Sequence, residues 1–235
     1  EYAGASAIHL NIFGPKPLEK FGNAEQKREN LPKIISGEEK MCFAVTEPNS
    51  GLDTSSLETK AERTNSGYVI NGRKIWTTGA QRADKILIIA RTTPKDQCAK
   101  PYLGLSLFYT DLDRGKIEAN PIPKMGRKAI DSNAVFYDNM PVPYDDLIGE
   151  EGKGFHYILH GLNPERILLA AGIPGVHGRV RTRVHGRRNA RNGRPARFRF
   201  SLPPTAHTRS PFSPRTGVAA FVILSSVVII TTQRT

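Results

Sequence analysis

Two short stretches in the first half of the chain place hydroxyl, amide and aromatic groups at positions where strands are expected to end. Residues 41–45 form an apolar run that stops at a turn containing Pro, Asn, Ser and Gly, and Thr46 lies where this run ends. Residues 74–78 end in one Trp followed by two Thr. Strand-end hydroxyls, free backbone amides and a flat indole suit a planar ligand with polar edges, such as a flavin.

Between these stretches, Asn71-Gly72 separates the apolar residues 68–70 from residues 74–76. An Asn-Gly pair between two such runs is the strongest short-range signal for a two-residue hairpin. The sequence therefore predicts a tight turn at this pair.

The run 45–48 with Gly51 and Asp53, followed by residues 71–72 and 75–78, resembles the central β-domain of the acyl-CoA dehydrogenase family. Both motifs occur in the family's order and at about its separation. The resemblance extends more loosely from the N-terminus to about Ala171.

The resemblance implies an FAD-dependent enzyme that oxidises the Cα–Cβ bond of an acyl-CoA thioester. In that family a Glu removes the α-proton while the β-hydrogen leaves as hydride to the flavin. The family further implies electron-transfer flavoprotein as the acceptor and pairing of subunits into a homo-oligomer. An acyl-CoA oxidase that uses oxygen is the open alternative. The family's catalytic base belongs to later helices, so no catalytic residue is assigned here, and the chain alone is expected to be inactive and to bind FAD weakly at best.

The resemblance also assigns binding residues. Those assigned to the flavin are Phe43, Val45, Thr46, Trp76 and Thr78. Those assigned to acyl-CoA are Gly51, Leu52, Thr92, Asn163 and Arg166. Leu52 departs from the Ser or Thr usual in the family, and Asn163 stands where better-known members have Asp. Arg166 suits phosphates as a fork-shaped cation.

The expected fold class is α+β with several domains. The end of an N-terminal helical domain occupies residues 1–37, a central antiparallel β-barrel or sandwich occupies 38–148, and a C-terminal helical domain starts at 149–171. Residues 172–235 form an atypical, Arg-rich tail that is expected to be disordered or translated out of frame. Because the chain begins in the middle of a helical pattern, we expect it to be a fragment.

Capping signals set the expected helices. Asn23 and Gln26 form a capping-box pair that opens a helix through Leu31, and Pro32 is expected to interrupt it. A later helix begins near Phe155 and is expected to restart at Pro164 with Asn163 as its cap and to run to Ala171.

Apolar runs set the expected strands at 85–91, 102–109 and 134–137, with the last closed by Asn139. Several short strands with turn signals between them favour a barrel or sandwich over a parallel sheet with helical crossovers.

The positive charge of the chain lies in its tail. The formal net charge is +12, and 12 of the 34 basic residues are arginines of residues 172–235, which contain no acid, so residues 1–171 balance 22 basic against 22 acidic residues. Two interpretations stay open: an Arg-rich arm that binds nucleic acid, and an out-of-frame or intron-derived translation, which we favour. The apolar run 218–230 is 13 residues long, too short for the roughly 20 that a membrane helix needs.

Other candidate sites carry weaker signals. His156 and His160 have the spacing of two metal ligands on one helix face, but no third ligand accompanies them. Residues 126–128 are interpreted as a solvated basic turn rather than a phosphate site. Cys42 and Cys98 have no metal-ligand spacing and indicate a reducing compartment; the sequence leaves the choice between mitochondrion, peroxisome and bacterial cytosol open.

Overall fold

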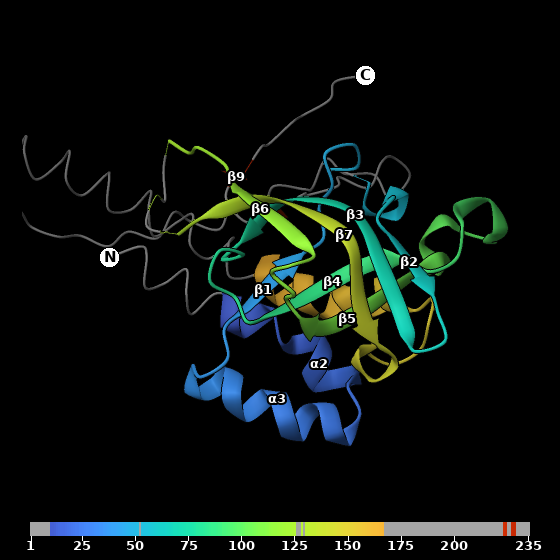
Figure 1. The fold of residues 1–235 in the computed structure, drawn as a ribbon, viewed down its shortest axis with the longest axis horizontal. Helices are drawn as coiled ribbons and strands as arrows, with labels where there is room; N and C mark the ends of the chain where they lie inside the picture. Colours follow the sequence, from blue (N-terminus) through green and yellow to red (C-terminus); the bar gives the residue numbers. More distant parts are fainter. Residues whose placement is uncertain are drawn as a thin grey trace, which may run out of the picture. The chain divides into compact units, whose positions relative to one another are not determined.

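The structure of the chain, a computed structural model, describes residues 10–166 apart from 52, 126, 127 and 129, together with 223–224 and 227–228 (Figure 1). The predicted tail apart from these four residues, the basic turn at 126–127 and the expected end of the last helix at 167–171 therefore lie outside the described residues. The two short strands β8 (Ile223–Leu224) and β9 (Val227–Val228) pair with each other in antiparallel fashion.

Helices precede the sheet and lie beneath it in Figure 1. Residues 10–13 are helical, followed by α2 (Lys16–Phe21) and α3 (Ala24–Ser36). The predicted capping box is present, because the Asn23 side chain accepts from the Gln26 N–H at 2.8 Å and the Gln26 side chain accepts from the Asn23 N–H at 2.9 Å. The two residues thus satisfy two of the N–H groups that a helix start leaves unpaired.

The expected stop at Pro32 is wrong, since α3 continues through it to Ser36 and ends at Gly37 with a φ of 78°. A proline inside a helix removes one hydrogen bond. The turn beyond it buries Ile34 to 3% exposure in the cluster under the sheet. We infer that this packing outweighs the lost hydrogen bond.

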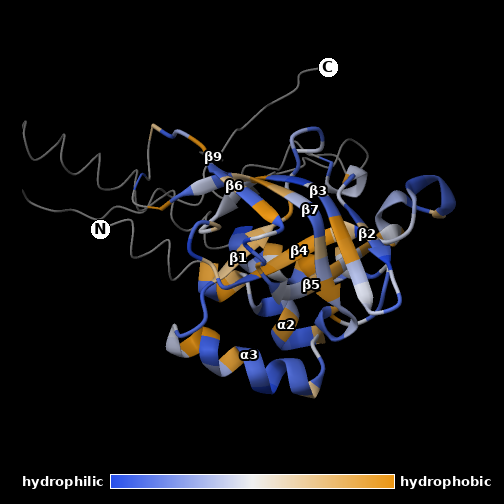
Figure 2. Cartoon of the chain, viewed as in Figure 1, coloured by the Kyte–Doolittle hydropathy of each residue, from blue (hydrophilic) through white to orange (hydrophobic). Residues whose placement is uncertain are grey.

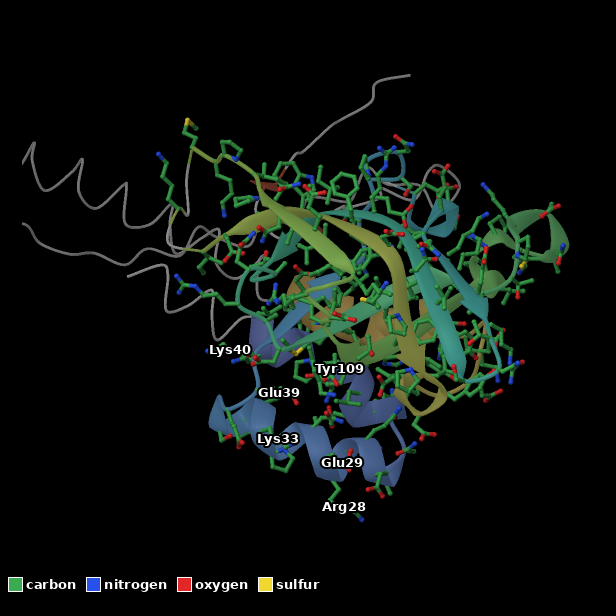
Figure 3. The ribbon with its side chains drawn as sticks, viewed as in Figure 1. Arg28, Glu29, Lys33, Glu39, Lys40 and Tyr109 are labelled. Carbon is green, nitrogen blue, oxygen red and sulfur yellow. The ribbon has the colours of Figure 1, made fainter. Side chains whose placement is uncertain are left out.

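The end of α3 is tied to the sheet by a buried hydrogen bond. The Tyr109 hydroxyl donates to Glu39 Oε1 at 2.6 Å, and Figure 3 shows these two side chains between α3 and the sheet, while Arg28, Glu29 and Lys33 project from the helix. Burial and the neighbouring Glu39 carboxylate hold the pKa of Tyr109 well above its usual value.

Seven strands form one sheet. Their bounds are β1 (Met41–Ala44), β2 (Lys60–Arg63), β3 (Gly67–Thr78), β4 (Lys85–Arg91), β5 (Leu105–Asp111), β6 (Ile117–Pro121) and β7 (Ser132–Pro143). Their order is β1-β4-β2-β3-β7-β6, with β5 on the other edge of β4 and an additional pairing of β1 with β3. This arrangement confirms the expected β-domain with flanking helices, and it adds parallel pairings of β4 with β1 and β2.

Strands β1 and β2 share one row of the sheet. Both run parallel to β4, with Met41 opposite Lys85 and Lys60 opposite Arg91, and both also pair with β3. They therefore lie end to end between β3 and β4. Residues 45–59 form a loop, called here the 45–59 excursion, that leaves the sheet between the two strands. The C-terminal end of β1 and the N-terminal end of β2 therefore both border this loop.

Strand β4 is buried on both faces, as its apolar run predicted. Ile86 and Ile88 belong to one core cluster, and Leu87 and Ile89 belong to the other. The second cluster includes residues of α2, α3 and the helical segment 154–166, so these helices cover that face of the sheet. Figure 2 shows the hydrophobic colour concentrated on β4 and β5. Within the described part of the chain, no helix has the length and apolar character needed to cross a membrane.

The predicted hairpin at Asn71-Gly72 is wrong, because β3 runs through this pair without turning. The connection between β2 and β3 lies earlier, where the Thr64 N–H donates to Gly67 O at 2.8 Å. Gly72 has a φ of 146°, and a Cβ built there would lie 2.7–2.9 Å from atoms of Thr59. The glycine therefore permits close approach of a neighbouring segment rather than a turn.

Two other strand bounds differ from the prediction. Strand β5 begins at Leu105 instead of Tyr102, because residues Pro101–Gly104 form a 3-10 turn. Strand β7 continues past Asn139, which has a φ of 51°, and includes Pro141 and Pro143. The pairing of β6 with β7 ends opposite Tyr137, so these prolines lie where β7 has an open edge and lose no sheet hydrogen bond on that side.

The expected helix restart at Pro164 is also wrong. Residues 154–166 are helical without interruption. Gly154 starts this segment against β5, where a Cβ would lie 2.5 Å from the backbone of Ser106 and Leu107.

Candidate functional site

The ends of β1 and β3 meet and bring the five predicted flavin residues together. Phe43 pairs with Thr78 across the two strands. Two residues past β1, Thr46 O accepts from the Ile75 N–H at 2.9 Å. All five residues are partly exposed rather than buried: Phe43, Val45, Thr46, Trp76 and Thr78. Hydroxyl groups and an indole from two strands thus share one partly open strand end.

A β-bulge in β3 sets the direction of Trp76. Lys74 pairs with Val135 and Thr77 pairs with Asn133, so β3 carries one residue more than β7 over this interval. Trp76 has a φ of 65°, a left-handed conformation that is uncommon for a residue with a side chain. As a result Lys74 and Thr77 are both buried, while the two residues between them remain partly exposed.

Side chains from β7, from the loop after β3 and from the turn between β5 and β6 hold this bulge. Asn133 Nδ2 donates to Thr77 O at 3.0 Å, and Gln81 Nε2 donates to Asn133 Oδ1 at 3.0 Å. Arg114 Nη1 donates to Ala80 O at 2.6 Å. These bonds fix the backbone on the C-terminal side of Trp76.

A buried ion pair lies beneath the strand ends. Lys74 Nζ donates to Glu47 Oε1 at 2.8 Å and to Val45 O at 3.0 Å, and the two side chains are 0% and 5% exposed. The Glu47 carboxylate also accepts from the N–H groups of Glu58 at 2.6 Å and Thr59 at 3.0 Å. The pair therefore joins β1, the start of β2 and β3.

Burial and pairing shift both pKa values. Burial lowers the pKa of Lys74 to about 8, although the charge of Glu47 opposes this. Burial alone would raise the pKa of Glu47, but the charge of Lys74 and the three hydrogen bonds outweigh it, and the net pKa is lowered. Glu47 is therefore a weak base at neutral pH.

The turn that follows Glu47 contains two of the predicted acyl-CoA residues, Gly51 and Leu52. Asp53 caps the 3-10 turn Thr54–Ser56 through Oδ1, which accepts from the Ser55 N–H at 3.0 Å. Gly51 is partly exposed, and a Cβ there would meet no atom within 4 Å. Leu52 lies outside the described residues.

The remaining predicted acyl-CoA residues lie in two other places. The Thr92 hydroxyl lies 2.8 Å from the Ser106 hydroxyl, so it belongs to the junction of β4 and β5. Asn163 does not cap a helix; its Oδ1 accepts from Arg166 Nη1 at 2.8 Å on an exposed helix face. The Arg166 guanidinium is thus presented to solvent.

The two histidines of this helix form no metal site. His160 Nδ1 lies 3.1 Å from Lys20 Nζ, and both rings pack against Phe21. Among the described residues, no group of three His, Cys, Asp or Glu side chains is placed to hold a metal ion.

A cavity of about 380 Å³ lies next to the ion pair. Residues of four segments line it: Glu47, Pro48, Asn49, Glu58, Thr59, Gly72, Arg73 and Phe136. Sequence reasoning missed this cavity and the role of Lys74. The alternation of side chains along β3 could have revealed Lys74, because it lies an even number of residues from the inward-facing Tyr68 and Ile70.

The described residues thus form a β-domain with helices on one face of the sheet, and with hydroxyls and one indole at a strand end. The profile of the acyl-CoA dehydrogenase middle domain matches residues 42–140. Isovaleryl-CoA dehydrogenase, mitochondrial, of Oryza sativa subsp. japonica is 38% identical over 160 residues, which cover 68% of this chain and 38% of the rice protein.

Solved structures agree. An acyl-CoA dehydrogenase from Geobacillus kaustophilus is similar with a TM-score of 0.64 and 34% identity, over 69% of this chain and 42% of the other. An FAD complex of PigA has a TM-score of 0.63 and 26% identity, over 68% of this chain and 41% of the other. The chain belongs to the acyl-CoA dehydrogenase family and spans less than half the length of these relatives.

Proposed function

We propose that the described part of the chain forms the flavin-facing and thioester-facing portion of an enzyme that dehydrogenates acyl-CoA thioesters between Cα and Cβ. The observation that carries this proposal is the meeting of β1 and β3, where Phe43 pairs with Thr78 and Thr46 bonds to Ile75. These are among the residues that the resemblance assigns to the flavin, and their meeting at one strand end supports the proposal.

The donor set at this strand end fits an isoalloxazine ring. Thr46 and Thr78 are partly exposed residues whose hydroxyls can bond the polar ring edge, and Trp76 offers a flat apolar surface to the ring face. When bound, FAD would supply the acceptor for the hydride that leaves the substrate. Phe43 and Val45 complete the rim of this strand end.

Other residues of the chain have proposed roles in holding the substrate. Gly51 and Thr92 would line the thioester arm, and Asn163 with Arg166 would meet the pantetheine and phosphate parts of CoA. Glu47 is not the base that removes the α-proton, because Lys74 and two backbone N–H groups already bind its carboxylate. An electron-transfer flavoprotein is the proposed acceptor of the electrons, and a homo-oligomer is the proposed assembly of the complete enzyme.

Titration of the full chain with FAD tests the proposed flavin site. We expect quenching of flavin fluorescence, and a dissociation constant that rises about tenfold when Thr46 and Thr78 are both replaced by Ala, since each hydrogen bond contributes about 0.5–1.5 kcal/mol. Thr64→Ala is the matched control, because that hydroxyl donates to Gly67 O in the β2–β3 turn. Equal affinity of the double variant and the parent chain would contradict the assignment of these hydroxyls.

The proposed substrate class is tested separately. An acyl-CoA thioester added anaerobically to a complete relative that carries this domain should bleach the flavin absorbance, whereas the free acid of the same chain length should not.

A further inference from the structure

We propose that Lys74 is a positioning residue of the flavin site, whose ammonium group, anchored by Glu47, fixes the Val45 carbonyl and the bulge that presents Trp76. This inference rests on the proposed function. Lys74 contributes no atom to the partly open strand end, because its side chain is 0% exposed, and it acts through the backbone of residues that do.

The contacts of the ammonium group reach both strands of the site. On one side it bonds Val45 O at 3.0 Å, the carbonyl that precedes Thr46. On the other side its own backbone lies directly before the bulge formed by Ile75 and Trp76. One inward-pointing side chain therefore sets the spacing between the end of β1 and the end of β3.

Glu47 extends this control to the thioester-facing turn. Its carboxylate binds Lys74 and the N–H groups of Glu58 and Thr59, which closes the excursion 45–59 at both ends. Gly51 lies within this excursion. The same ion pair thus sets the relative positions of the proposed flavin and thioester contacts.

Stability alone does not account for a buried lysine here. Removing two charges from water is costly, and replacing a buried ion pair by apolar residues of similar volume is often neutral or stabilising. A methionine would fill nearly the same volume as Lys74 and would leave Ile70 and Tyr68 their inward packing. What methionine lacks is the donor to Val45 O, so we assign that bond to the geometry of the site.

The chain offers a direct reporter of this geometry, because Trp76 is its single tryptophan. The test compares the full chain with the double variant Lys74→Met/Glu47→Gln, which removes both charges and so leaves no unpaired charge in the interior. Lys85→Met is the matched control, since Lys85 forms an ion pair with Asp111 at 3.0 Å at the opposite end of β4.

We expect the double variant to keep the far-ultraviolet circular dichroism and the cooperative urea transition of the parent. Its Trp76 emission should shift to longer wavelength and become more accessible to acrylamide, and its dissociation constant for FAD should rise at least tenfold. Lys85→Met should change neither. A folded double variant with unchanged Trp76 emission, unchanged quenching and unchanged FAD affinity would overturn the proposal.

A second variant covers the case in which the double variant does not fold. Glu47→Asp keeps both charges but shortens the anchor by one methylene, so it should draw the ammonium group away from Val45 O and shift the Trp76 emission in the same direction. An unchanged emission in this variant would count against Lys74 as a positioning residue. A parent chain that shows not even weak binding of FAD would count against the proposed flavin site, whereas the Trp76 emission would still decide the role of Lys74.

Discussion

Breaking the buried pair from one side should cost much more stability than removing it entirely. In Lys74→Met, Glu47 stays 4% exposed with only its two backbone N–H donors. At pH 7 the unpaired Glu47 carboxylate can lose its charge only by taking up a proton, which costs about 3.4 kcal/mol for a carboxyl with the ordinary pKa of 4.5. In Glu47→Gln, Lys74 can lose its proton at a cost of at most about 4.8 kcal/mol from its ordinary pKa of 10.5. We therefore expect each single variant to lose about 3 kcal/mol.

The double variant Lys74→Met/Glu47→Gln should lose about 1 kcal/mol or less, because neither charge remains. Urea unfolding of the four chains at pH 7 measures this cycle. With a slope of about 2 kcal/mol per molar urea, each single variant should shift the midpoint by about 1.5 M. Loss of less than about 1 kcal/mol in both single variants, or additivity of the two losses within about 0.5 kcal/mol, would refute the view that the charges are mutually compensated.

Three further predictions concern stability. Gly72→Ala should cost about 3 kcal/mol in urea unfolding, since its Cβ would meet Thr59 at under 3.0 Å and its φ is positive. The control Gly51→Ala has open space around the added Cβ and should cost less than about 0.5 kcal/mol. Equal losses in the two variants would contradict the role of Gly72 in close approach. Asn23→Ala should cost about 1 kcal/mol by removing the capping box, and no loss would show that the helix start needs no cap. Burial raises the pKa of Glu165 to about 7, so its contribution to stability is fully present below pH 4.5 and is lost as the pH rises through about 7. Glu165→Gln should therefore raise the urea midpoint at pH 8 but not at pH 4.5, and the same change at both would argue against a raised pKa.

Local signals predicted the features that depend on local contacts. The capping box of Asn23, the doubly buried β4 and the end of β1 before Thr46 all follow from residues within a few positions of one another. Gathering the flavin candidates at one strand end was expected from the resemblance. The structure confirms that their strands meet there; their binding role stays a prediction.

The features that were missed depend on partners far along the chain. Asn71-Gly72 has the composition of a turn, but Thr59 on one side and β7 on the other decide that it continues a strand. The bulge at Trp76 exists because the register with Asn133 and Val135 differs by one residue from an even ladder. Neither relation leaves a trace in the neighbouring sequence.

Lys74 could have been recognised as a buried residue, because it lies an even number of positions after Tyr68 and Ile70, which face inward on the same strand. Its partner could not, because Glu47 precedes it by 27 positions and comes to it only when β1 pairs with β3.

The shared row of β1 and β2 has a consequence for how this domain tolerates change. Because the two strands occupy one row end to end, the 45–59 excursion can gain residues near the exposed Asn49 without altering the register of β1 or β2 with β3 and β4. Lengthening a surface loop costs little, about 0.6 kcal/mol for each doubling. Insertions there can therefore reshape the ligand-facing rim of the domain while the sheet keeps its pairing, and a two-residue insertion after Asn49 should leave the urea midpoint close to that of the parent. The 45–59 excursion can therefore vary in length and sequence, whereas the strands paired on either side of it must keep their register.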